Sequence, residues 1–142
     1  MSEVEVTEGG CLCGAVRYRI TGPVSPGAYC HCSMCRKSGG GPVSAWISAP
    51  QERFEFIGET APAVYESSSE GRRRFCPKCG SQLTFESTGN PDTVAITVGT
   101  LDNPDAHPPH LHFWTSSAIS WFHLKDDLPS FEKTPPIGGG KD

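Results

Sequence analysis

Seven cysteines in three short groups constrain this 142-residue chain more than any other feature. In chain order they are Cys11 and Cys13, then Cys30, Cys32 and Cys35, then Cys76 and Cys79. Thiolates at such spacings are typical zinc ligands; four of them close a tetrahedral site, whereas three leave one position open. Because seven is four plus three, the sequence predicts one closed and one open metal site. The odd count also argues against a complete set of internal disulfides, as a disulfide-rich secreted domain would have.

The closed site is predicted to form around Cys76-Pro77-Lys78-Cys79-Gly80, which has the form of a zinc knuckle. Two thiolates three residues apart on a tight turn hold one ion, so two further ligands are needed. Cys11 and Cys13 can supply them, because residues i and i+2 of a strand point to the same face. The alternative pairs Cys11 and Cys13 with part of the 30–35 group, and it leaves the knuckle short of ligands.

The open site is predicted on Cys30, Cys32 and Cys35, whose loop can wrap three sides of an ion. A histidine is the rival fourth ligand. His31 points away from the neighbouring cysteines if that segment is extended. His110 and His112 share a face and could bind metal, although the pattern favours paired surface imidazoles or imidazoles that support a ligand. A water could also close the site and leave the metal purely structural.

Strict alternation of apolar residues predicts strands, most clearly at Val16-Tyr18-Ile20 and Val94-Ile96-Val98. The 16 glycines and 13 prolines favour many turns over long helices. We therefore expect one all-β domain over residues 1–132, with small, mostly antiparallel sheets around a structural zinc and little helix, followed by a disordered tail over 133–142. Strands are predicted at 14–20, 43–49, 54–56, 63–66, 72–75, 83–85 and 94–98, one helical turn at 36–41, and a last apolar segment at 119–124.

The formal net charge of −4 gives no electrostatic case for binding nucleic acid or an anionic membrane. The basic run Arg72-Arg73-Arg74 is interpreted as a solvated strand edge, with the grip of an anionic substrate as the alternative. No segment resembles a signal peptide or a spanning helix of ~18 apolar residues. Because thiols stay reduced in the cytosol, clustered metal-binding cysteines make a cytoplasmic location the expectation.

Three cysteine motifs with their flanks resemble one known family. They are Gly10-Cys11-Leu12-Cys13-Gly14, Cys30-His31-Cys32-Ser33-Met34-Cys35-Arg36 and Phe75-Cys76-Pro77-Lys78-Cys79-Gly80, supported by Tyr65–Ser68, Gly99–Asp102, His112–Trp114, Trp121 and Leu128–Phe131. This set is similar to the glutathione-dependent formaldehyde-activating family, which also contains centromere protein V. The resemblance covers about residues 9 to 131.

The resemblance implies a β-rich fold shared with methionine sulfoxide reductase B and a small guanine-nucleotide-exchange chaperone. It implies two zinc ions per chain, a structural one on Cys11, Cys13, Cys76 and Cys79, and a second on Cys30, Cys32 and Cys35, which would be the catalytic residues in their role as zinc ligands. The implied reaction condenses glutathione with formaldehyde to S-(hydroxymethyl)glutathione, the activity of a carbon–sulfur lyase. Arg36, Lys37 and Arg74 are candidates to meet the carboxylates of glutathione.

Two readings from other function classes remain open. A non-catalytic zinc module that binds or carries glutathione, or a protein partner, would keep all seven cysteines. The second is a redox enzyme like the sulfoxide reductase, whose chemistry depends on a reactive cysteine late in the sequence. No cysteine follows Cys79, which argues against this function. The glycine run Gly39–Gly41 lacks the lysine and the spacing of a phosphate-binding loop.

Overall fold

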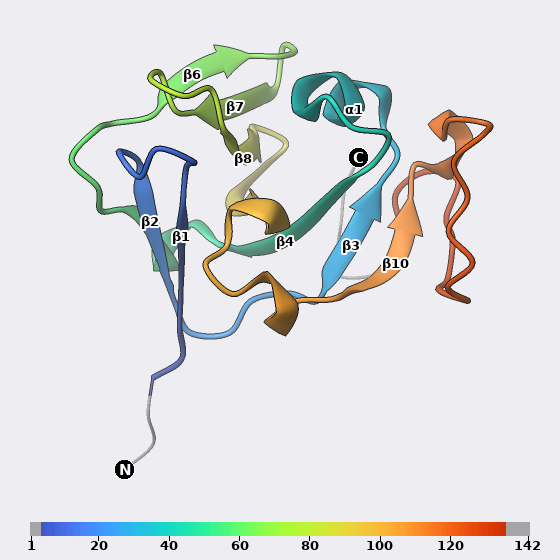
Figure 1. Ribbon diagram of the computed structural model, residues 1–142, viewed down its shortest axis with the longest axis horizontal. Coiled ribbons are helices and arrows are strands. Elements are labelled where there is room, and N and C mark those ends of the chain that lie inside the picture. The colour runs from blue at the N-terminus through green and yellow to red at the C-terminus, as the bar shows by residue number, and fades with distance from the viewer. Residues whose placement is uncertain (1–3, 136–142) are drawn as a thin grey trace.

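Two sheets make up most of the molecule in the computed structural model, which describes residues 4–135 (Figure 1). The smaller sheet has the order β1-β2-β5 and is antiparallel throughout. Its strands are β1 (Val6–Gly10), β2 (Arg17–Thr21) and β5 (Phe54–Phe56). The predicted class, mostly antiparallel β with little helix, is confirmed.

The larger sheet has the order β10-β3-β4-β9-β8-β7-β6, and its neighbours are antiparallel except for the parallel pair β10–β3. Its strands are β3 (Gly27–Cys30), β4 (Ser44–Pro50), β6 (Ala63–Glu66), β7 (Gly71–Phe75), β8 (Gln82–Ser87), β9 (Asn90–Thr97) and β10 (Pro109–Phe113). The helix α1 (Ser33–Gly39) follows β3, and short 3-10 turns lie at Gln51–Arg53, Val98–Thr100, Pro104–Ala106 and Thr115–Ser117.

The core draws on both sheets, because each strand turns alternate residues inward. Tyr18 and Ile20 of β2 are fully buried, and so are Leu83 of β8 and Ile96 of β9. The buried hydroxyl of Tyr18 lies 2.8 Å from that of Thr100, which satisfies its hydrogen-bonding capacity. The core thus fixes the smaller sheet against the larger one.

The parallel pair β3–β10 returns the late part of the chain to the three-cysteine loop. Phe113 of β10 lies opposite Cys30 of β3 in the register. The backbone amide of His31 then donates to the carbonyl of Phe113 over 3.0 Å. In Figure 1, β10 and the segment that follows it stand beside β3, close to α1. The backbone around Cys30 is therefore held by residues more than 80 positions later in the chain.

Several predicted elements differ from the structure. The helical turn expected at 36–41 begins earlier, at Ser33, and ends at Gly39, and it is capped by Gly40, whose positive φ of 79° suits glycine. Cys11 and Cys13 lie in the turn between β1 and β2 rather than on a strand.

The basic run was predicted as a solvated strand edge, and this is wrong for Arg73. The run lies on β7, which pairs with β6 and β8 and is therefore not an edge strand, and its residues alternate between an exposed and a buried face. Arg72 is exposed, whereas Arg73 is only 3% exposed. Most of the tail predicted over 133–142 lies outside the described residues. Within residues 4–135, no helix has the length and apolar character needed to cross a membrane.

Candidate functional site

Four cysteine side chains from two distant turns form one compact cluster. Cys11 and Cys13 come from the turn between β1 and β2, and Cys76 and Cys79 from the turn between β7 and β8. All four sulfurs lie within 4.8 Å of one another, with 3.6 Å between Cys11 and Cys13 and 3.8 Å between Cys13 and Cys76. Four thiolates in this arrangement can hold one metal ion with no position left open. This is the set of four predicted for the closed site.

Backbone amides of the knuckle point at the buried sulfur of Cys76. The amides of Lys78 and Cys79 lie 3.3 and 3.4 Å from this sulfur. Gly80 follows with a φ of 82°, a conformation that residues with a Cβ rarely adopt. Amide donors aimed at a sulfur stabilise its thiolate form, which is the form that binds a metal.

The acidities of Cys13 and Cys79 differ widely. Hydrogen bonds from the hydroxyl and the backbone of Ser81 lower the pKa of Cys79 to about 5. A backbone hydrogen bond from Ala15 lowers the pKa of Cys13, but the nearby sulfur of Cys11 and burial raise it more, to about 11. Like charges this close cannot all persist without compensation, and a bound cation would supply it.

The other three cysteines surround the start of α1. Cys30 ends β3 and is 3% exposed, Cys32 precedes the first helical residue, and Cys35 lies in the first turn. They do not form a second cluster as compact as the first within residues 4–135. All three nevertheless line a single cavity of about 450 Å³, which they share with the aromatic side chains of Trp46, Phe85, Phe113 and Trp114.

Cys35 has more thiolate character than Cys30. A hydrogen bond from Cys30 is the largest cause that lowers the pKa of Cys35 to about 6, and the positive charge of Arg73 lowers it further. The same sulfur–sulfur contact, together with burial, raises the pKa of Cys30. The loop therefore offers one readily ionised sulfur at the wall of the cavity.

Arg73 is a candidate site residue that the sequence interpretation did not single out, because it offered the run Arg72-Arg73-Arg74 only as a whole, with the grip of an anionic substrate as the alternative. Its Nη2 lies 3.6 Å from the sulfur of Cys35, and its Cζ lies 4.7 Å from the centroid of the Phe85 ring. Its side chain borders the cavity of the three cysteines and a second cavity of about 620 Å³. The available signal was the period of two along β7, which places Arg73 on the opposite face from Arg72.

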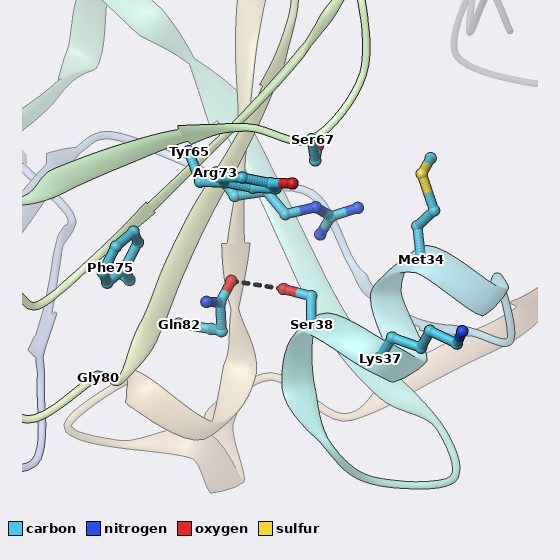
Figure 2. A pocket seen from close by; sticks show the side chains of 9 residues that line it. All are labelled: Met34, Lys37, Ser38, Tyr65, Ser67, Arg73, Phe75, Gly80 and Gln82. Atoms are coloured by element: carbon cyan, nitrogen blue, oxygen red, sulfur yellow. Dashed lines mark hydrogen bonds between the residues drawn. The ribbon is translucent and has the colours of Figure 1, made fainter.

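The three basic residues predicted to meet glutathione have different environments. Arg36 donates from Nη1 to the carbonyl of Ser117 over 3.1 Å. Arg74 forms an ion pair with Glu86, with 2.9 Å between Nε and Oε1. Lys37 borders the second cavity, where Figure 2 shows it on α1.

A chain of two imidazoles and a carboxylate lies behind the cysteine loop. His31 Nε2 is 2.9 Å from His112 Nδ1, and His112 Nε2 is 2.8 Å from Asp126 Oδ2. The ring of Tyr29 stacks on that of His112 with 4.9 Å between centroids. His112 is thus 6% exposed and bonded on both nitrogens, whereas His110 is exposed. These two hydrogen bonds hold the segment around residue 126 against the three-cysteine loop.

The chain is similar to known proteins in both sequence and fold. The profile of the glutathione-dependent formaldehyde-activating enzyme family matches residues 6–117. A Halomonas elongata protein described as "Putative glutathione-dependent formaldehyde-activating enzyme" is 31% identical over 129 residues, 83% of this chain and 80% of that protein. A Rhodobacter sphaeroides crystal structure covers 87% of this chain with a TM-score of 0.56 and 17% identity, a likeness in fold alone. The chain therefore belongs to the glutathione-dependent formaldehyde-activating enzyme family.

Proposed function

We propose that the chain binds glutathione, or a similar small thiol, beside Cys30, Cys32 and Cys35 and condenses it with formaldehyde to S-(hydroxymethyl)glutathione. The carrying observation is a cavity lined by all three cysteines in a chain of this family. The reaction joins the thiol sulfur to the aldehyde carbon, and the thiol proton passes to the former carbonyl oxygen. No other atom is gained or lost, and the reverse direction is that of a carbon–sulfur lyase.

The proposal includes two zinc ions per chain. Cys11, Cys13, Cys76 and Cys79 would hold a structural ion, which their compact geometry supports. Cys30, Cys32 and Cys35 would hold the second ion with one position open. Zinc bound there supplies a site at which an incoming thiol is deprotonated at neutral pH.

The residues around the cavity can orient the reactants and exclude water. Trp46 and Phe85 contribute apolar walls, and the three sulfurs lie at the same cavity. A bound thiol confined there meets a small aldehyde in a limited set of orientations, and such positioning can account for a large part of a rate enhancement. The imidazole chain behind the loop keeps His31 fixed next to Cys30 and Cys32.

Cobalt substitution tests thiol binding directly. Glutathione titrated into the cobalt protein should increase the thiolate-to-metal charge-transfer absorption, and Cys32→Ser should abolish the increase. Ser33→Ala is the matched control, because this exposed neighbour carries no thiol and should leave the response unchanged. A spectrum that does not move at millimolar glutathione would contradict ligation of this thiol.

The assay for turnover is a separate measurement. The wild-type zinc protein should accelerate formation of S-(hydroxymethyl)glutathione from glutathione and formaldehyde, and Cys32→Ser should not. If the cobalt spectrum responds but the product forms no faster than without protein, the chain binds or carries the thiol, and the enzymatic proposal is refuted.

A further inference from the structure

Arg73 is a buried cation without a carboxylate partner among residues 4–135. Its side chain is 3% exposed, and none of the ion pairs in this part of the chain includes it. The neighbouring arginines on β7 differ, since Arg72 is exposed and Arg74 pairs with Glu86. Removing a guanidinium from water is costly unless a charge or hydrogen bonds compensate it. The sulfur of Cys35 and the ring of Phe85 compensate part of this cost, and the rest depends on the remaining nitrogens of the guanidinium.

Only one nitrogen of the Arg73 guanidinium has a hydrogen-bond partner among the described residues. Nη2 donates to the sulfur of Cys35, while the buried atoms Nε and Nη1 have no hydrogen-bond partner. Buried donors are almost always satisfied in folded proteins, so two orphaned ones on one side chain indicate a missing acceptor. If Arg73 served only as the counter-charge to the Cys35 thiolate, it would need Nη2 alone, and the burial of Nε and Nη1 without partners would have no explanation.

The second cavity next to Arg73 is lined by positive charge and by no negative charge. Lys37 and Arg73 are its two charged residues, and no aspartate or glutamate lines it. Ser67 brings a buried hydroxyl without a partner, and Ser38 brings a second hydroxyl, bonded to Gln82 over 2.6 Å. In Figure 2 the guanidinium of Arg73 extends toward α1, between the side chains of Ser67 and Met34.

Arg73 also stands between this cavity and the three cysteines. The smaller cavity contains Cys30, Cys32 and Cys35 together with Arg73 and Met34, and the larger one shares these last two residues. A ligand whose sulfur lies at the cysteines would therefore reach the cationic cavity with atoms a few bonds away. Thiols that carry a carboxylate have such a shape.

We propose that Arg73 binds a carboxylate of the substrate thiol, so that the site selects thiols bearing a carboxylate over neutral thiols. The inference rests on the proposed function for the identity of the thiol, and it adds a specificity-determining residue and the chemistry that residue recognises. Lys37 strengthens the field from the exposed rim of the same cavity. Guanidinium groups suit this task because they stay charged and offer several donors in one plane.

The test compares ligands by calorimetry on the zinc-loaded protein. S-methylglutathione retains both carboxylates but has no free thiol, so its binding does not require metal ligation. The wild type should bind it about 10- to 100-fold more tightly than its dimethyl ester, the range typical of hydrogen bonds to a charged group. In Arg73→Gln most of the difference between the acid and the ester should disappear, and Arg73→Lys should recover part of it. Arg72→Gln, an exposed neighbour on the same strand, is the matched control and should behave as wild type.

The outcomes separate this inference from the proposed function. Equal binding of acid and ester to the wild type, or equal weakening of both in Arg73→Gln, would overturn the role of Arg73 and show that it serves the cysteine sulfurs alone. Binding of S-methylglutathione that depends on Arg73, without a cobalt response to glutathione, would support Arg73 and contradict the proposed metal ligation. The comparison of acid with ester in the wild type needs no variant, so the inference stays testable even if Arg73→Gln does not fold.

Discussion

Replacing Cys76 by serine should remove the structural metal and with it the fold. The sulfur of Cys76 is fully buried, lies 3.8 Å from that of Cys13, and accepts from two backbone amides. A serine hydroxyl is shorter than a thiol and remains protonated at neutral pH, so it does not replace a thiolate ligand. Because a structural ion typically binds only the folded state, the lost binding energy is lost folding energy.

The expected loss is comparable to the whole stability of a domain. Structural zinc contributes about 10 to 16 kcal/mol in small domains, whereas domains of this size are stable by only about 5 to 15 kcal/mol. Cys76→Ser should therefore give unfolded or insoluble protein, measured by circular dichroism, thermal melting and zinc content per chain. Cys32→Ser is the matched control, because it should lose the second zinc and keep the fold. A soluble Cys76→Ser variant with unchanged melting temperature and zinc content would refute the assignment, as would mild chelation that strips this site before the other.

Three further predictions concern the scaffold. Leu83→Ala removes a fully buried core side chain and should lower the free energy of unfolding by about 2 to 5 kcal/mol in urea titrations; a loss below ~1 kcal/mol would contradict the packing. Tyr18→Phe deletes the hydroxyl 2.8 Å from Thr100 and should cost about 1 kcal/mol, seen as a lower melting temperature without loss of zinc. Hydrogen bonds from Arg17 lower the pKa of Asp102 below its ordinary value of 3.8, so this pair stabilises the fold above about pH 4 and the contribution disappears as the pH falls further. Asp102→Asn should lower the free energy of unfolding at neutral pH by less than about 1 kcal/mol. The melting temperature of the variant should therefore fall less steeply than that of the wild type below about pH 4, and an unchanged dependence on pH would exclude the contribution.

The strands that the sequence predicted best are those with one buried face. Val16-Tyr18-Ile20 and Val94-Ile96-Val98 alternate, and the structure buries all six of these side chains. The helix was misplaced because Cys32, Ser33 and Met34 show no helical period, and its start is fixed by the turn into it rather than by an apolar face. None of its residues is buried, so no pattern of burial could have marked its limits.

The candidate site was predictable where residue type alone determines the chemistry. The spacing of the cysteines was sufficient to predict that Cys11 and Cys13 lie beside the knuckle, because thiols at such spacings are typical ligands of one metal ion. Arg73 could not be found in the same way. Its role depends on which face of β7 meets the cysteine loop, and that follows from the order of strands in the sheet, a property encoded far from the residue itself.

The four-cysteine cluster can be completed only late in the synthesis of the protein. Cys13 and Cys76 are separated by 63 positions, so the ribosome needs about 3 to 13 seconds, at 5 to 20 residues per second, before the second pair of ligands exists. During that interval the first pair is a free dithiol on an unfinished chain, open to oxidants and to any metal that two sulfurs can hold. If the cluster holds the proposed zinc, the supply of that ion, and the protection of two early thiols until it arrives, become conditions for obtaining folded protein in the cell.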